Sequence, residues 1–238
     1  MPKFKLYAHQ VAGLEHVGNG EHVIVASKTS SGKSLIYQLP ILKGLYESDQ
    51  FRALAIFPTK ALTQDQKISM DRLLSNYLST KNMVDIFDGD TDKERRAGIR
   101  ESTAVIFTNP DMLHVSILPN HYLWKQFFTR LRIIVVDELH TYSGTFGLHC
   151  SFIMRRLQRI CNYYGNNSLQ FICCSATISN PKEVHNFSNI CSTWKHFSIL
   201  KMSRLWILIL LHVGQDITLL GIHHYETLIM LIEDIALQ

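Results

Sequence analysis

The chain has 238 residues, of which 46% are hydrophobic and 18% are charged, with 12 glycines and 6 prolines. This composition is that of a globular protein and excludes collagen-like, low-complexity and long disordered segments. The formal net charge of +4 permits a nucleic-acid partner but does not by itself indicate one. The five cysteines form no Cys-x-x-Cys pair, so neither a zinc site nor a disulfide framework is predicted.

Short apolar runs alternate along the chain with stretches of helical periodicity. Six runs of strand length, apolar or β-branched at nearly every position, cover residues 22–27, 52–57, 83–87, 104–108, 132–137 and 170–175. The predicted helices cover residues 33–46, 61–78, 92–102, 147–164 and, further on, 181–190. This alternation predicts an α/β fold with a mostly parallel sheet and helices on both faces. Ligands of such folds gather at the carboxyl ends of the strands.

A candidate phosphate-binding loop follows the first predicted strand, with the sequence Lys-Thr-Ser-Ser-Gly-Lys-Ser at residues 28–34. Backbone N–H groups and a helix N-terminus would surround a polyphosphate here. The Lys33 ammonium would reach the β- and γ-phosphates, and the Ser34 hydroxyl would ligate Mg²⁺. Ser27 stands where the first glycine of a P-loop is expected, but small residues at 27, 30 and 31 still allow close approach of the backbone. The alternative is an ordinary polar loop that caps a helix.

Two adjacent carboxylates, Asp137 and Glu138, stand at the end of the fifth predicted strand. Asp137 is a candidate to hold Mg²⁺ through water, and Glu138 is a candidate to orient and deprotonate an attacking water. Burial of this pair without a cation or solvent would be costly. Lys33, Asp137 and Glu138 are therefore the predicted catalytic residues. His140 is interpreted as a polar link between a nucleotide and a nucleic-acid surface, with a solvated loop histidine as the alternative.

The order of these motifs resembles the first RecA-like domain of a superfamily 2 helicase of DEAD/DEAH type, with Asp-Glu-Leu-His at residues 137–140. More narrowly, residues 6–181 resemble the Hrq-type DNA helicases, which are relatives of RecQ. The resemblance implies a RecA-like P-loop NTPase domain that uses ATP and Mg²⁺ and binds single-stranded DNA, with RNA as the alternative. Residues 7–10 resemble the Q motif, in which Gln10 would read adenine. The other implied nucleotide-binding residues are Thr29, Ser30, Ser31, Gly32, Lys33 and Ser34.

Two further segments resemble motifs that line the path of one nucleic-acid strand. Residues 58–62 match motif Ia and contain Thr59 and Lys60, and residues 108–113 match motif Ib and contain Thr108 and Asn109. Donors of this kind bind a phosphate backbone without reading bases. The alternative for each is a helix N-cap, a duty that does not exclude a phosphate contact.

Residues 175–177 resemble motif III, whose hydroxyls connect hydrolysis to strand movement. With His140, the residues Ser175 and Thr177 are therefore implied to couple the two events.

Residues 1–198 are predicted to form the helicase ATP-binding domain, and residues 199–238 form a divergent apolar tail that resembles nothing in the family. This tail is either a truncated or misassembled gene product or alternative splice end, or an added strand or helix of the core. Its dense apolar run, residues 205–211, is far below the roughly 20 residues that cross a bilayer, so no membrane partner is expected.

A superfamily 2 motor has two RecA-like domains, and the second, which supplies the arginine fingers, is expected to be missing here. Such a residue is worth roughly 10³ to 10⁵ in rate, so the isolated chain is expected to be weakly active or inactive. The alternative is a non-motor fragment that binds nucleotide or a single strand. A 3′ to 5′ direction and a nuclear location are implied by the resemblance alone.

Overall fold

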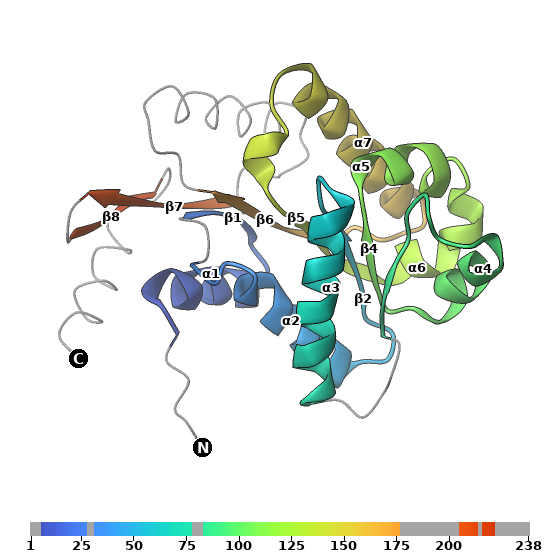
Figure 1. Cartoon of the computed structure of the whole chain (residues 1–238), viewed down its shortest axis with the longest axis horizontal. Helices are drawn as coiled ribbons and strands as arrows, with labels where there is room; N and C mark the ends of the chain where they lie inside the picture. The colour runs from blue at the N-terminus through green and yellow to red at the C-terminus, as the bar shows by residue number, and fades with distance from the viewer. Residues whose placement is uncertain (1–5, 28–30, 78–82, 177–204, 214–215, 222–238) are drawn as a thin grey trace.

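A computed structural model of the chain describes residues 6–27, 31–77, 83–176, 205–213 and 216–221, and it is built around one sheet (Figure 1). The strands follow one another across the sheet in the order β3-β4-β2-β5-β6-β1-β7-β8. Their bounds are β1 (His22–Ser27), β2 (Arg52–Ile56), β3 (Val84–Ile86), β4 (Val105–Thr108), β5 (Leu131–Val136), β6 (Gln170–Ala176), β7 (Leu205–Val213) and β8 (Asp216–Gly221). Every described pair from β3 to β7 is parallel, and β7 pairs with β8 in the antiparallel sense.

Helices and helical turns connect these strands. Their bounds are α1 (Ala8–Gly18), α2 (Leu35–Glu47), α3 (Lys60–Ser75), α4 (Lys93–Ser102), α5 (Pro110–Met112), η1 (Leu113–Ile117), η2 (His121–Trp124), α6 (Lys125–Arg130), η3 (Leu139–Thr141) and α7 (Gly144–Tyr163). Parallel strands require crossover connections of this kind, because the chain must return to the same end of the sheet before each new strand.

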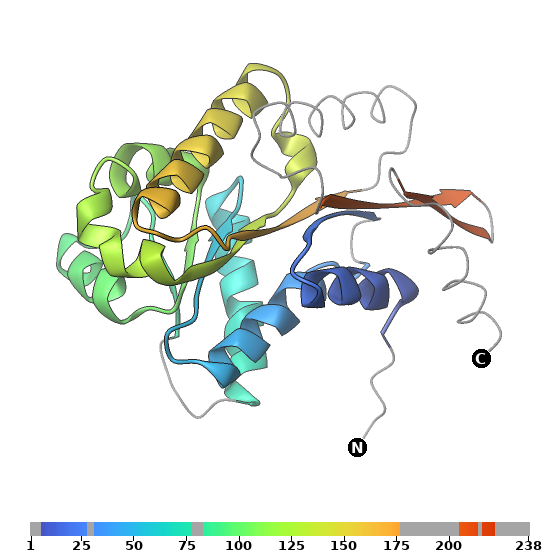
Figure 2. The same ribbon diagram turned by 180° about the vertical axis from the view of Figure 1, so that it is seen from behind.

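Two hydrophobic cores cover the two faces of the sheet, with α1, α2 and α3 on one face and α6 and α7 on the other (Figure 2). The alternate residues of β1 divide between them, since Ile24 packs in one core and Val25 in the other. All six residues of β1 are buried, which explains why this strand reads as a continuous apolar run. The predicted α/β fold with helices on both faces is confirmed.

The six predicted strands and the first four predicted helices are all present, with ends that differ by up to three residues from the observed bounds. The helix predicted at residues 181–190 lies outside the described residues. The structure adds α1 and the short helices between β4 and β5, which the apolar periodicity did not predict.

The predicted tail contributes β7 to the sheet. This strand pairs with β1 in parallel register, from His22 opposite Leu205 to Ala26 opposite Ile209. The domain boundary placed at residue 198 stays a prediction. Within the described part of the chain, no helix is both long and apolar enough to span a bilayer.

Candidate nucleotide and nucleic-acid site

The candidate phosphate loop lies between the end of β1 and the start of α2. Gly32 has φ +73°, a left-handed conformation that glycine adopts without the strain of a side chain. Lys33 donates from Nζ to the carbonyl of Ser27 at 2.6 Å, and the hydroxyls of Ser27 and Ser31 lie 2.5 Å apart. The predicted nucleotide-binding residues Thr29 and Ser30 lie outside the described residues.

Helix α1 packs its first turn against this loop. Gln10 is 2% exposed, and its amide is engaged on both sides: Oε1 accepts from Tyr7 N–H at 2.8 Å, and Nε2 donates to the Gly32 carbonyl at 2.9 Å. The reading of adenine by Gln10 stays a prediction, because in this structure the amide bonds the protein itself. A Cβ at position 32 would lie 2.5 Å from Gln10 Nε2, so the close packing also requires glycine there.

Asp137 and Glu138 follow β5 at the same edge of the sheet as the loop, since β5, β6 and β1 are parallel neighbours. Burial raises the pKa of Asp137 to about 6, although its carboxylate accepts the Glu138 N–H at 2.9 Å. Glu138 has φ +51°, a left-handed conformation that is uncommon for a residue with a side chain. Strained conformations of this kind cluster at functional sites.

The Lys33 ammonium lies within electrostatic reach of both carboxylates. Burial lowers the pKa of Lys33, while Cys174, Glu138 and Asp137 act in the opposite direction. Ser34 is the N-cap of α2, and its hydroxyl makes no capping hydrogen bond. A hydroxyl and a buried carboxylate are oxygen ligands of the class that Mg²⁺ prefers, so the residues present fit that ion.

His140 connects the strand end of β5 to that of β6. Its Nδ1 accepts the Ala176 N–H at 3.3 Å and lies 3.1 Å from Glu138 Oε2. A ring nitrogen that accepts a hydrogen bond carries no proton in that tautomer and cannot donate, so Glu138 Oε2 is left without a donor among the described residues. Ser175 is fully buried beside this contact, and Thr177 lies outside the described residues. The coupling role of His140, Ser175 and Thr177 stays a prediction.

The motif Ia and Ib residues lie at the same edge, where β2 and β4 end. Thr59 caps α3 by accepting the Leu62 N–H at 3.3 Å, and Asn109 caps α5 by accepting the Met112 N–H at 2.9 Å. Both side chains therefore perform the capping duty that was the alternative reading. Lys60 donates to Asp90 Oδ2 at 2.6 Å in an exposed ion pair.

Thr108 is buried at the end of β4. The residue is 1% exposed, and its hydroxyl donates to the Phe87 carbonyl at 2.7 Å. The hydroxyl therefore holds the loop that follows β3 in this structure, and the phosphate contact of Thr108 stays a prediction.

That loop, residues 87–91, is held by contacts within the loop and by contacts from Arg96. Asp88 Oδ1 accepts from the Asp90 N–H and the Thr91 hydroxyl, and Arg96 donates to the carbonyls of Thr91 and Asp88. The Arg96 guanidinium also lies 5.3 Å from the centre of the Phe87 ring. The loop is thus a fixed feature beside motif Ia.

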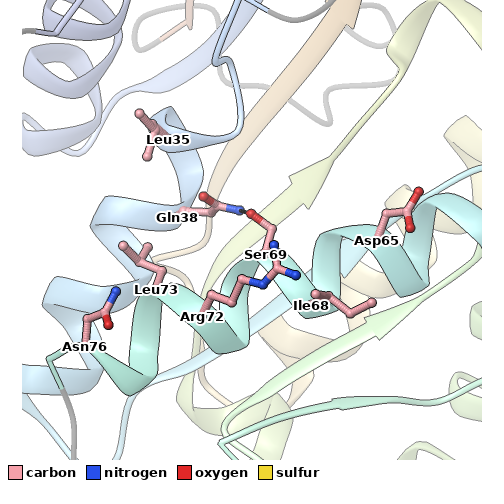
Figure 3. A pocket seen from close by; sticks show the side chains of 8 residues that line it. All are labelled: Leu35, Gln38, Asp65, Ile68, Ser69, Arg72, Leu73 and Asn76. Carbon is pink, nitrogen blue, oxygen red and sulfur yellow. Dashed lines mark hydrogen bonds between the residues drawn. The ribbon is translucent and has the colours of Figure 1, made fainter.

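Two grooves flank α3. One, of about 620 Å³, separates α3 from β3 and the loop of residues 87–91, and Lys60 and Asp90 line it. The other, of about 510 Å³, lies between α2 and α3, where Gln38 donates to Ser69 Oγ at 3.1 Å (Figure 3). None of the predicted catalytic, nucleotide-binding or nucleic-acid-binding residues lines the second groove.

Two residues of the site were missed by the motif analysis. His9 contacts the Ser31 carbonyl through Nε2 at 3.0 Å, and Asp90 pairs with Lys60. The signal for His9 was its position beside Gln10. The signal for Asp90 was its segment, residues 87–91, which resembles a loop beside the strand path in the family, but its pairing with Lys60 could not be predicted, because Lys60 lies thirty residues earlier in the chain.

Comparison with known proteins agrees with this geometry. The sequence profile of the DEAD/DEAH box helicases matches residues 7–185. The chain belongs to this family. The helicase domain is 51% identical over 191 residues to the ATP-dependent helicase hrq1 of Schizosaccharomyces pombe, a match that covers 78% of this chain and 18% of the relative. It is 45% identical over 181 residues to the uncharacterized ATP-dependent helicase YprA of Bacillus subtilis, covering 76% and 24%.

A solved structure gives the same assignment. The crystal structure of the DUF1998 helicase MrfA bound to DNA and AMPPNP is 43% identical, with a TM-score of 0.71, and the match covers 77% of this chain and 26% of that chain. The chain therefore spans about a quarter or less of the length of these relatives.

Proposed function

We propose that this chain is the ATP-binding part of an ATP-dependent DNA helicase, which couples ATP hydrolysis to movement along a single strand. One observation carries the proposal: the loop that contains Lys33 follows β1, and Asp137 and Glu138 follow β5, so the parallel strands β1, β6 and β5 bring all three residues to one edge of the sheet. The helicase names of the relatives and the DNA-bound state of MrfA support the substrate class.

Each residue of the site has a chemical task in this proposal. Lys33 exchanges the Ser27 carbonyl for a phosphate oxygen, and the N-terminus of α2 presents backbone N–H groups to the same phosphates. Ser34 and Asp137 would hold Mg²⁺, which would neutralise charge on the phosphates. Glu138 accepts a proton from the attacking water, and its Oε2, which has no donor among the described residues, is available for that proton.

The nucleic acid lies across the edge where β2 and β4 end. Lys60 and the amide of Asn109 contact phosphate oxygens there, beside the N-termini of α3 and α5. Contacts of this kind do not read bases, so binding is tolerant of sequence and weakened by salt. His140, Ser175 and Thr177 transmit the state of the nucleotide to this edge through β6.

Turnover of ATP tests the proposal. The purified chain is expected to hydrolyse ATP slowly, and single-stranded DNA is expected to stimulate that slow hydrolysis. Lys33→Ala is expected to lower ATP affinity about 10- to 100-fold, the worth of a charged hydrogen bond. Glu138→Gln is expected to retain ATP binding and lose about 10²- to 10⁴-fold in rate, because the amide cannot take the proton. ATP binding that is indifferent to Lys33 would contradict the proposal.

The rate itself separates a motor from a binding fragment. We propose that full activity needs arginine fingers from a second RecA-like domain, which are worth roughly 10³ to 10⁵ in rate. The 238-residue chain alone is then expected to bind ATP and a single strand but to turn over slowly. Rapid unwinding of a tailed duplex by this chain would overturn that expectation.

The finer assignments are tested separately. We propose DNA over RNA, which the DNA-bound structure of MrfA supports, and 3′ to 5′ movement and a nuclear location, which rest on the family resemblance alone. Competition between deoxyribose and ribose oligonucleotides, duplexes tailed at either end, and a fluorescent fusion imaged in cells test the three in turn. Equal competition by the ribose oligonucleotide would contradict the first of them.

A further inference from the structure

Two adjacent side chains of α1 bind two adjacent carbonyls of the phosphate loop. His9 Nε2 lies 3.0 Å from the Ser31 carbonyl oxygen, and Gln10 Nε2 lies 2.9 Å from that of Gly32. A carbonyl oxygen only accepts, so both side chains donate, and His9 carries its proton on Nε2. The Q motif implies a role for Gln10 and none for His9.

The direction of a carbonyl fixes the direction of the next N–H. A trans peptide is planar, and its C=O and N–H bonds point to opposite sides of the chain. The chain has no cis peptide among its described residues. His9, by holding the Ser31 carbonyl toward α1, turns the N–H of Gly32 away from α1. Gln10 does the same for the N–H of Lys33. These two N–H groups belong to the loop that would surround a polyphosphate.

The donor of His9 is itself held in place. The residue is 9% exposed, and its ring lies parallel to that of Tyr7, with 5.8 Å between the centres and 8° between the planes. Burial is the largest cause that lowers the pKa of His9. The hydrogen bond with the Ser31 carbonyl raises this pKa, and the repulsion of Lys33 lowers it further. A neutral imidazole in a fixed orientation is a directional donor.

We propose that His9 is a positioning residue for ATP, which aligns the Gly32 N–H with the phosphates by holding the Ser31 carbonyl. The proposal rests on the proposed nucleotide site and extends it to a residue outside the loop. In this arrangement, α1 organises the phosphate half of the site, because both groups of the Gln10 amide are already bonded to the protein.

Tripolyphosphate with Mg²⁺, which has no base, is therefore the informative probe beside ATP. His9→Phe keeps an aromatic ring beside Tyr7 but removes the donor, and we expect it to weaken both ligands about 3- to 10-fold, the worth of one hydrogen bond. His9→Gln restores an N–H at similar reach and is expected to bind within about twofold of the original chain. His16→Phe is the matched control, because His16 lies on the same helix but bonds Glu21 instead of the loop.

Calorimetric titration of the full chain measures these affinities. Unchanged tripolyphosphate binding in His9→Phe would overturn the proposal. So would a loss of ATP affinity alone, which would assign His9 to the base, or an equal loss in His9→Gln, which would assign the effect to packing. His9→Met, which also lacks the donor, replaces His9→Phe if that variant does not fold. If the original chain binds neither ligand, the proposed nucleotide site fails, and not merely the role of His9.

Discussion

Asp137 is buried at the end of a strand, and this burial raises its pKa to about 6 from its ordinary value of 3.8. The sign of the stability effect follows from this direction. Above pH 6 the carboxylate is charged in both the folded and unfolded states, and the folded state bears the full cost of burying it. Between pH 6 and 3.8 the folded state takes up the proton first, so the cost disappears as the pH falls.

We therefore expect Asp137→Asn, which is neutral at every pH, to be more stable than the original chain at pH 7.5. The gain is at most about 3 kcal/mol and shrinks toward zero near pH 4, because each pKa unit is worth about 1.4 kcal/mol. Urea unfolding of both proteins in EDTA at the two pH values measures the difference. A gain that grows on acidification would contradict the burial of this charge.

Glycines in two helices differ in the space that a side chain would have. A Cβ at Gly147, in the first turns of α7, would lie 2.2 Å from the Tyr142 carbonyl oxygen, whereas a Cβ at Gly98 in α4 would meet nothing within 4 Å. The first glycine allows α7 to pack against the segment that follows Glu138. The second only adds flexibility to its helix.

Alanine substitutions at these positions are expected to change stability in opposite directions. Gly98→Ala is expected to stabilise the chain by about 0.5–1 kcal/mol through helix propensity. Gly147→Ala is expected to destabilise it, because backbone must move to admit the methyl group. Chemical unfolding compares the two, and a stabilising Gly147→Ala would show that the close approach is absent in solution.

The exposed ion pair of Lys60 and Asp90, between α3 and the loop after β3, determines the net charge at motif Ia. Asp90 offsets Lys60, and both are solvent-accessible, so the pair itself is worth little to folding. Asp90→Asn is expected to tighten binding of a fluorescent oligothymidylate about 2- to 5-fold in low salt and to lose that gain in high salt.

Asp92→Asn is the matched control, since it removes the same charge two residues away at the start of α4, where the side chain makes no capping bond. Fluorescence anisotropy across a salt series separates the two. If both variants tighten binding equally, the effect of Asp90→Asn comes from net charge alone and not from its pairing with Lys60.

Elements with a clear period were predictable, and those without one were not. Buried strands such as β1 are apolar at almost every residue, so their positions followed directly from the sequence. The segment between β4 and β5 instead contains the three-residue helix α5 and the five-residue π-helical turn η1, both too short for a helical period to be recognised in the sequence. Residues 7–10 were recognised as a motif, but only the structure shows that they lie at the start of α1.

The site divides in the same way. Lys33, Asp137 and Glu138 were predictable because each stands at the end of an apolar run, and parallel strands bring such ends together. The burial of Thr108 and the contact of His9 with Ser31 were not, because they depend on which distant carbonyl lies opposite each side chain.

At the scale of the whole molecule, β7 protects the edge of the sheet next to the phosphate loop. Removal of residues 205–238 would expose the backbone of β1, whose six residues are otherwise buried. We expect a chain cut after residue 204 to melt at least about 5 °C lower and to self-associate. Thermal melts with size-exclusion chromatography check this, and a monomer of unchanged melting temperature would contradict it.

The strand order also governs when the loop can form during synthesis. Among the described strands, β1 pairs only with β6 and β7, and β6 begins at residue 170. A ribosome that adds about 5–20 residues per second leaves β1 without a partner for roughly 7 to 30 s. Through that interval an apolar strand and the sequence of the loop are exposed on the nascent chain. A chain released before β6 is complete therefore carries every residue of the phosphate loop, but it lacks the strand that pairs with β1 beside that loop. Nucleotide binding is then one of the last properties that the growing chain acquires.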